Sequence, residues 1–309
     1  MINLAADWNN LPKDHEARST KLPWYHKTIE YQLRPPFVKL LEEWSNVAPD
    51  DVIQHIYRAR RKAWRVFPWP CIGEFWFVEQ GLRRHPDYSD VLKRMTSSNS
   101  RFLDIGSCLG QDIRTLAHDG APTSNLYGVD VLPGFKDVGY ILFRDSDRID
   151  PSHFITSNIF TNDLTGRNDL TKTRGTWDII HVSMFLHLFE LPEQEAALKN
   201  IMRLLKPIPG STILGTEPGS LEADVAVQKA PFCDLGKSIA AFRHSRESLK
   251  SSLEKVADAL ILEAKVWTAY DNEVTDEIEA GHRRNRMDSE IRLFNDHKER
   301  RILFRVDLI

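Results

Sequence analysis

Residues 101–116, RFLDIGSCLGQDIRTL, are the stretch that decides the fold. An apolar run over 102–105, interrupted by Asp104, gives way to a turn of glycine, serine and cysteine. From about Gln111 the apolar residues recur at helical spacing. This order predicts a strand, a tight loop and a helix. Glycines in such a loop let the backbone approach a ligand, and the start of the helix offers unpaired N–H groups. The stretch therefore favours a nucleotide-like cofactor.

The spacing of Gly106 and Gly110 distinguishes between a nicotinamide cofactor and S-adenosylmethionine. A dinucleotide fingerprint needs G-x-G-x-x-G after the strand. Here three residues, 107–109, separate the two glycines and no third glycine follows, which disfavours a nicotinamide cofactor. Asp104 places a carboxylate at the end of the strand, where it can accept from an ammonium group or, through water, from the methionine part of S-adenosylmethionine. The pattern Asp104-x-Gly106-x-x-x-Gly110 resembles motif I of class I methyltransferases.

A second acid supports this interpretation. The strand expected over 125–130, NLYGVD, ends in Asp130, roughly 20 residues after the glycine turn, the position from which an acid reaches ribose hydroxyls. A carboxylate that faces a vicinal diol accepts from both O–H groups. The expected cofactor-binding residues in this part of the chain are Asp104, Gly106, Ser107, Gly110, Asp130 and Val131. After a third strand over 153–156, Asn158 is expected to bond the adenine edge and Ile159 to cover its face. An ordinary strand-exit loop is the alternative.

Composition excludes several classes of protein. The chain has 309 residues, a mean hydropathy of −0.40 and a net charge of −3, so it can bury a large core and has no overall basic field for nucleic acid. No apolar run approaches the ~20 residues of a membrane span, and the first residues are too polar for a signal peptide. Three widely spaced cysteines predict neither disulfides nor a metal site and fit a reducing compartment. We therefore expect a cytoplasmic protein without a metal.

The chain divides into three predicted parts. Residues 1–34 form a polar leader whose aromatic later part folds onto the rest, as a lid over the cofactor. Residues 35–98 form a helical extension, and 99–309 form the cofactor-binding core. The aromatic segment 67–80, FPWPCIGEFWFVEQ, is interpreted either as a wall of the substrate pocket or as core packing, which aromatic side chains dominate.

Three histidines are candidates for a general base. The fourth strand, expected over 177–182 (WDIIHV), is apolar enough to be buried on both faces. His181 and His187 flank its end, where the methyl group would be delivered, and His181 is also a candidate cofactor contact. His244 precedes a predicted helix that ends near Leu260. A histidine with a purely structural role is the alternative at each position.

The C-terminal third is predicted to complete the sheet. A fifth strand is expected over 211–216, followed by a loop-rich insertion over 220–242 that contributes to the acceptor pocket. Alternating residues over 262–270 and 302–309 predict a closing antiparallel hairpin. Within it, the charged segment 271–301 is long for a hairpin connection. Solvated helix or disorder is the main expectation for this segment, and a homodimer contact is the alternative.

Several segments together resemble a known family. They are FPWPCIGEFWFVEQGLRRHPDY, FLDIGSCLGQDIRTLAHDGAPTSNLYGVD, DIIHVSMFLHLF, LLKPIPGSTILG and FRHSRESL. They are similar to fungal class I S-adenosylmethionine methyltransferases of secondary metabolism, including carboxyl O-methyltransferases of meroterpenoid biosynthesis, over roughly residues 35 to 270. The resemblance implies an α/β fold with a seven-stranded sheet in the order 3-2-1-4-5-7-6. It also implies a small-molecule acceptor methylated on a carboxyl or acidic hydroxyl oxygen. Glu217-Pro218 departs from the family, where a Gln and an apolar residue are common.

Two points stay open from the sequence. A carboxylate acceptor needs no base, whereas an ordinary hydroxyl would need one. The same cofactor motifs would also serve a protein that binds S-adenosylmethionine and steers a cyclisation or isomerisation without methyl transfer. A noncatalytic interaction protein that uses segment 271–301 is a third, weaker hypothesis.

Overall fold

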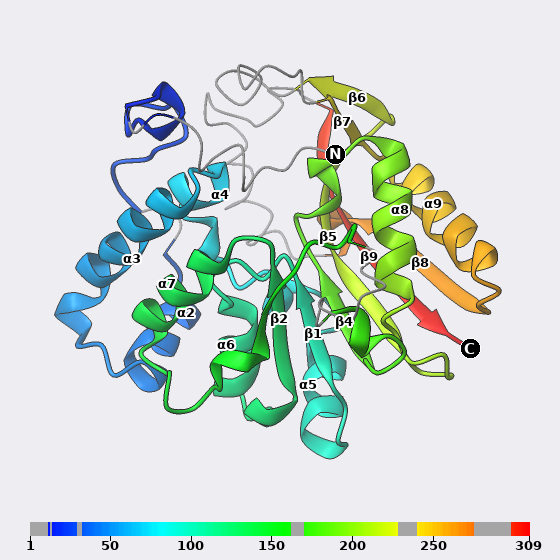
Figure 1. The fold of residues 1–309 in the computed structure, drawn as a ribbon, viewed down its shortest axis with the longest axis horizontal. Coiled ribbons are helices and arrows are strands. Elements are labelled where there is room, and N and C mark those ends of the chain that lie inside the picture. Colours follow the sequence, from blue (N-terminus) through cyan, green and yellow to red (C-terminus); the bar gives the residue numbers. More distant parts are fainter. Residues whose placement is uncertain (1–11, 13, 30–32, 162–169, 228–239, 275–297) are drawn as a thin grey trace.

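The computed structural model describes residues 12, 14–29, 33–161, 170–227, 240–274 and 298–309. Its centre is a seven-stranded sheet in the order β3-β2-β1-β4-β5-β9-β8 (Figure 1). The strands are β1 (Phe102–Ile105), β2 (Leu126–Asp130), β3 (Phe154–Thr156), β4 (Ile179–Val182), β5 (Thr212–Ser220), β8 (Ala264–Tyr270) and β9 (Glu299–Leu308). The first five pair in parallel, and β9 is antiparallel to both neighbours. Because β8 and β9 are the sixth and seventh strands of this sheet along the chain, the predicted order is confirmed.

Helices cover both faces of the sheet. They are α2 (Pro35–Lys39), α3 (Val52–Val66), α4 (Pro70–Gly73), α5 (Tyr88–Ser97), α6 (Gln111–His118), α7 (Pro133–Phe143), α8 (Leu191–Met202), α9 (Arg246–Ala259) and α10 (Asp271–Val274). Successive side chains of β1 point to opposite faces. Phe102 packs with residues of α5 and α6, whereas Leu103 and Ile105 pack with residues of α8 and α9. The even positions of β1, Asp104 among them, therefore point toward the α6 side.

The N-terminal extension has its own core, which is built on α7. Helices α2 and α3 and the π-helical turn Leu40–Trp44 pack against α7. Trp24 and Ile29 are buried in the same core, so the described later part of the predicted leader does fold onto the extension. Phe67, Phe75 and Phe77 are also buried there, which favours core packing over a pocket wall for most of the aromatic segment. The lid role and the division at residues 34 and 98 stay predictions.

Two predictions about the C-terminal third need correction. Strand β5 continues to Ser220, beyond the predicted end at Thr216, because β9 pairs with it along its whole length. Pro218 lacks a backbone N–H, and it is tolerated there because the pairing of β4 with β5 ends at Leu214. The segment expected to be loop also contains two strands, β6 (Asp224–Val227) and β7 (Ala240–Arg243), which pair as a separate antiparallel ribbon.

Most of the charged segment 271–301, with its predicted dimer contact, lies outside the described residues. So do residues 228–239, between the two strands of the ribbon. No helix in the described ranges is long and apolar enough to cross a membrane.

Candidate functional site

The predicted glycine loop connects β1 to α6 and turns at its two glycines. Gly106 and Gly110 have φ values of +73° and +69°, a region that favours glycine. The amides of Gly106 and Ser107 donate to the Val129 carbonyl of β2 at 2.9 and 3.0 Å, which holds the loop against the neighbouring strand. A side chain on Gly128 of β2 would come within 2.7 Å of the Ser107 hydroxyl oxygen, so the close approach needs glycine there.

The thiol in the middle of this loop is not activated. Cys108 has a φ of +49° and its sulfur is a free thiol. Burial raises the pKa of this thiol well above its ordinary value, so it stays protonated at neutral pH. A protonated thiol is a poor nucleophile, so Cys108 serves the loop as a small residue.

A buried arginine that the sequence did not single out anchors the loop. Arg114 of α6 donates to Leu109 O at 3.1 Å and forms two hydrogen bonds, of 2.9 and 3.1 Å, with the Asp145 carboxylate. Both ionic side chains are fully buried. Asp145 also accepts from the Trp44 indole at 3.1 Å. One ion pair therefore connects the end of the glycine loop to α7 and the N-terminal extension.

Asp130 lies at the carboxyl end of β2 beside the loop, as predicted. Its oxygens accept from the amides of Cys108 at 3.1 Å and Leu132 at 2.9 Å. Burial outweighs these hydrogen bonds and raises the pKa of Asp130 to about 6. An ionised carboxylate has about four acceptor positions, and the two amides occupy two of them. Asp130 therefore keeps acceptor positions for a ligand.

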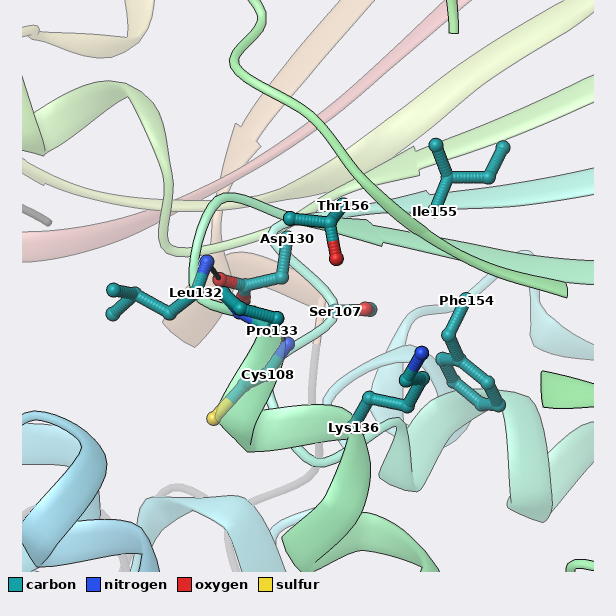
Figure 2. Close-up of a pocket in the computed structure, with 9 residues that line it drawn as sticks. All are labelled: Ser107, Cys108, Asp130, Leu132, Pro133, Lys136, Phe154, Ile155 and Thr156. Atoms are coloured by element: carbon teal, nitrogen blue, oxygen red, sulfur yellow. Dashed lines mark hydrogen bonds between the residues drawn. The ribbon is translucent and has the colours of Figure 1, made fainter. Parts of the chain in front are cut away.

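Asp130 is one of the residues that line a small surface hollow (Figure 2). The residues that line it are Ser107, Cys108, Asp130, Leu132, Pro133, Lys136, Phe154, Ile155 and Thr156. Sequence reasoning identified only Ser107 and Asp130 among them as cofactor-binding. The three β3 residues were missed because the strand was treated only as a support for its exit loop.

The predicted adenine contacts do not line this hollow. Asn158 is exposed, and its side-chain oxygen accepts from the Phe160 amide at 2.9 Å. Ile159 packs into the core around β4 and α8. Val131 is 39% exposed beside Asp130 and is also outside the lining. Their roles in cofactor binding stay predictions.

Asp104 and His181 form a buried pair between the central strands. They are register partners on β1 and β4, and His181 Nδ1 lies 2.8 Å from an Asp104 oxygen. The other ring nitrogen lies 2.8 Å from the Ser183 hydroxyl oxygen. Burial lowers the pKa of His181, but the carboxylates of Asp104, Asp112 and Glu217 outweigh burial, so the net shift is upward. Asp104 thus contacts His181, and sequence reasoning missed this partnership because 77 residues separate the two.

His187 lies on the loop after β4, next to a buried carboxylate. Glu217 of β5 accepts from the Phe185 and Leu186 amides at 2.9 and 3.0 Å, and its second oxygen lies 3.4 Å from His187 Nδ1. The Glu217 side chain is only 4% exposed and His187 9%. The residue noted as a departure from the family therefore shapes the loop that carries His187.

The third histidine is in a different setting. His244 Nδ1 lies 2.8 Å from the Ser248 hydroxyl, beside the Ser245 capping box of α9. Burial lowers its pKa to about 4, so it is neutral at pH 7 and a weak base. The structure thus brings His181 and His187 to the carboxyl end of β4 and places His244 just before the N-cap of α9.

The fold and this site define a class I methyltransferase. Residues 24–78 match the family model of the meroterpenoid methyltransferase N-terminal domain, and residues 103–208 match the methyltransferase domain. O-methyltransferase phiE of Fungal sp. is 37% identical over 246 residues, which are 80% of this chain and 79% of the relative. O-methyltransferase atr3 of Stereocaulon alpinum is 34% identical, over 80% of this chain and 68% of the relative.

A third relative is the asnovolin E/chermesin D methyltransferase nvfJ of Aspergillus novofumigatus, 37% identical over 60% of this chain and 64% of its own length. The chain belongs to this family of fungal O-methyltransferases of secondary metabolism, and S-adenosylmethionine is its methyl donor. Among solved structures, the N-terminal domain of EvdMO1 with SAH bound has a TM-score of 0.48 and 14% identity, over 82% of this chain and 97% of that chain.

Proposed function

We propose that this enzyme transfers the methyl group of S-adenosylmethionine to a carboxyl or acidic hydroxyl oxygen of a small secondary metabolite. The observation that carries the proposal is the convergence of three features at the carboxyl ends of β1, β2 and β4. They are the glycine loop, the Asp130 carboxylate with spare acceptor positions, and His187 held beside Glu217. Ligands of open α/β sheets bind at this edge, where the strand order reverses.

The cofactor is proposed to lie across the glycine loop, with its ribose on Asp130. The ribose hydroxyls would donate to the acceptor positions that Cys108 N and Leu132 N leave free. Gly106, Ser107 and Gly110 would let the cofactor approach the backbone. Val131, Asn158 and Ile159 are proposed to surround the adenine, on the basis of sequence position alone.

The acceptor is proposed to bind over the loop that follows β4. Three aromatic rings meet there, since Phe189 lies 5.4 Å from Phe185 and 5.0 Å from Phe160 between ring centroids. The β6–β7 ribbon is attached to the same place through the Phe242 amide, which donates to Phe189 O at 3.0 Å. These contacts offer an apolar surface to a small metabolite.

In the reaction, an acceptor oxygen attacks the methyl carbon in line with the carbon–sulfur bond. That bond breaks, its electron pair stays on sulfur, and S-adenosylhomocysteine leaves. Most of the acceleration comes from holding the two reactants in this geometry and excluding water. A carboxylate acceptor loses no proton. A hydroxyl acceptor would give its proton to His187 Nε2, which is free to accept when Nδ1–H donates to Glu217. Both ring nitrogens of His181 are already engaged, by Asp104 and Ser183, and His244 is the weakest of the three candidates.

The test begins with calorimetric titration of S-adenosylmethionine and S-adenosylhomocysteine into wild type, Asp130→Ala and the control Asp137→Ala, which removes an exposed carboxylate of α7. We expect the Asp130 variant to bind at least about tenfold more weakly, because hydrogen bonds to an ionised group are lost, and the control to match wild type. Candidate acids and phenols are then incubated with methyl-labelled cofactor, and mass spectrometry measures whether the acceptor has gained the mass of the labelled methyl group. Equal binding by the Asp130 variant, or cofactor turnover without a labelled product, would contradict the proposal.

We also propose that the enzyme acts in the cytoplasm, because the two cysteines in the described residues, Cys71 and Cys108, are free thiols, which fits a reducing compartment. A homodimer formed through segment 271–301 stays a hypothesis from the sequence, to be tested by sedimentation of the full chain.

A further inference from the structure

Ser183 ends a chain of three buried or half-buried side chains that the proposed mechanism does not use. Its hydroxyl oxygen lies 2.8 Å from His181 Nε2 and accepts from the Thr216 amide at 3.0 Å. His181 Nδ1 in turn meets Asp104 at 2.8 Å. Asp104 is 3% exposed and His181 2%, whereas Ser183 is partly exposed. Ser183 is therefore the member of the chain that a ligand can reach.

Ser183 also lies at the position where the fold places a ligand. It follows β4 directly, as Gly106 follows β1, and these adjacent parallel strands are where the strand order reverses. Ligands of open α/β sheets bind at the carboxyl edge beside such a reversal. Asp104 was expected to reach the cofactor from β1; one of its oxygens is bonded to His181, and its contact with the cofactor stays a prediction. Ser183 is partly exposed at this edge, so its hydroxyl is the group of this chain that is available to a ligand.

Charge around His181 favours the imidazolium form. Its ring and the Asp104 and Asp112 carboxylates each present an atom within 4.8 Å of the others, and all three residues are buried. Glu217 of β5 adds a third carboxylate that favours the cation, and burial opposes it. The net direction for the pKa of His181 is upward. A buried cation among carboxylates is stabilised by them.

The protonation of His181 decides which way the Ser183 hydroxyl points. A hydroxyl has one O–H donor and two acceptor positions. When His181 is an imidazolium, its Nε2–H and the Thr216 amide fill both acceptor positions, so the Ser183 O–H must donate outward. When His181 is neutral with its proton on Nδ1, facing Asp104, the Ser183 O–H turns inward to Nε2 and the outward donor is lost.

We propose that Ser183 donates this hydrogen bond to the methionine carboxylate of S-adenosylmethionine, and that the Asp104–His181 pair is the positioning group that keeps Ser183 a donor. The inference rests on the proposed function and goes beyond it. The carboxylate is the only anionic group of the cofactor, and an outward O–H at this edge of the sheet is complementary to it.

The proposal predicts a pH dependence with a definite sign. Cofactor affinity falls as pH rises through the pKa of His181, because the neutral ring takes back the Ser183 proton. The groups that face His181 are Asp104 on β1, Asp112 on α6, Glu217 on β5 and His85, which follows the turn Leu82–Arg84. Titration of the cofactor's own amine and of Asp130 affects wild type and a Ser183 variant alike. The difference between the two pH profiles therefore reports on His181.

The experiment measures calorimetric dissociation constants for S-adenosylmethionine and for its decarboxylated analogue from pH 6 to pH 9. The variants are Ser183→Ala, the conservative Ser183→Thr, and the control Ser124→Ala, an exposed serine just before the amino end of β2. We expect Ser183→Ala to weaken S-adenosylmethionine about tenfold or more near pH 7 and to leave the analogue unchanged. We also expect it to flatten the decline at high pH. Ser183→Thr should restore affinity.

A second variant, His181→Gln, tests the positioning role, after circular dichroism and thermal melting have shown that it folds. We expect it to weaken S-adenosylmethionine and to remove the same part of the pH dependence. Equal affinities of wild type and Ser183→Ala for S-adenosylmethionine would overturn this proposal alone. So would equal losses for the cofactor and its decarboxylated analogue. No cofactor binding by wild type would overturn the proposed function as well.

Discussion

Replacing Arg114 with methionine tests how the glycine loop is held. Arg114 and Asp145 are both fully buried, and the arginine donates to Asp145 twice and to Leu109 O once. Methionine is similar in length to arginine but apolar, so it leaves the Asp145 carboxylate without its cation. The Trp44 indole remains as a single neutral donor to that carboxylate. The variant therefore measures how much unfolding free energy an unpaired buried charge costs.

Breaking a buried ion pair from one side costs about 3–5 kcal/mol of unfolding free energy. The entropy of unfolding increases in proportion to chain length. For 309 residues, a loss of this size divided by that entropy gives a fall of about 5–8 °C in the melting temperature. Differential scanning calorimetry and urea denaturation measure both quantities. Since Leu109 O loses its donor, we also expect cofactor affinity to fall severalfold in a calorimetric titration.

Two controls separate the buried pair from a general effect of charge removal. Lys250→Met breaks an exposed pair on α9 and should cost no more than about 0.5 kcal/mol. The double variant Arg114→Met with Asp145→Leu replaces both charges by apolar groups and should recover most of the loss. A single variant that loses less than about 1 kcal/mol, or a double variant that is no more stable than the single one, would refute the reasoning.

Two further predictions concern the reaction site. Glu217→Gln replaces one of two amide-accepting oxygens by an NH₂ group and misaligns the loop that carries His187, so we expect turnover of an identified acceptor to fall about tenfold with cofactor affinity nearly unchanged. The exposed Glu222→Gln serves as its control, and an unaltered turnover would argue against the role of Glu217. For Asp130, whose pKa is raised to about 6, protonation removes the ribose acceptor, so S-adenosylmethionine should bind about tenfold more weakly at pH 5 than at pH 7. Because the folded state holds this proton more tightly than the unfolded chain, Asp130 itself favours folding as pH falls through 6, and circular dichroism at pH 5 should show that weak binding is not unfolding.

The parts of the site that sequence reasoning located share a local origin. The turn at Gly106 and Gly110 follows from glycine spacing after an apolar run, and Asp130 follows from its distance along the chain from that turn. Neighbouring residues specify these features through backbone conformation and the period of apolar positions. These local patterns can be interpreted without knowing which strands are adjacent. The family resemblance supplied the order of the strands, which local patterns do not contain.

The partners of the site residues have a different origin. Asp104 meets His181 because β1 and β4 are adjacent in a register that aligns them. Glu217 reaches the His187 loop because β5 extends past its pairing with β4. The ion pair of Arg114 joins residues 31 positions apart, and nothing in the residues around either one indicates the other. Each pairing depends on strand register or helix packing, which the whole chain decides.

The sequence by itself determined the strand, glycine loop and helix over residues 102–118, the acid at the end of the second strand, and, through family resemblance, the seven-stranded methyltransferase sheet. Only the tertiary structure decided that Asp104 pairs with His181, that Ser183 is the most exposed member of that chain, that the His244 ring meets the Ser248 hydroxyl, and that Glu217 holds the loop that carries His187. The physical reason is the range of the interactions. Backbone conformation and apolar periodicity are set by near neighbours, whereas the hydrogen-bond partner and pKa of a buried group are set by residues that folding brings together.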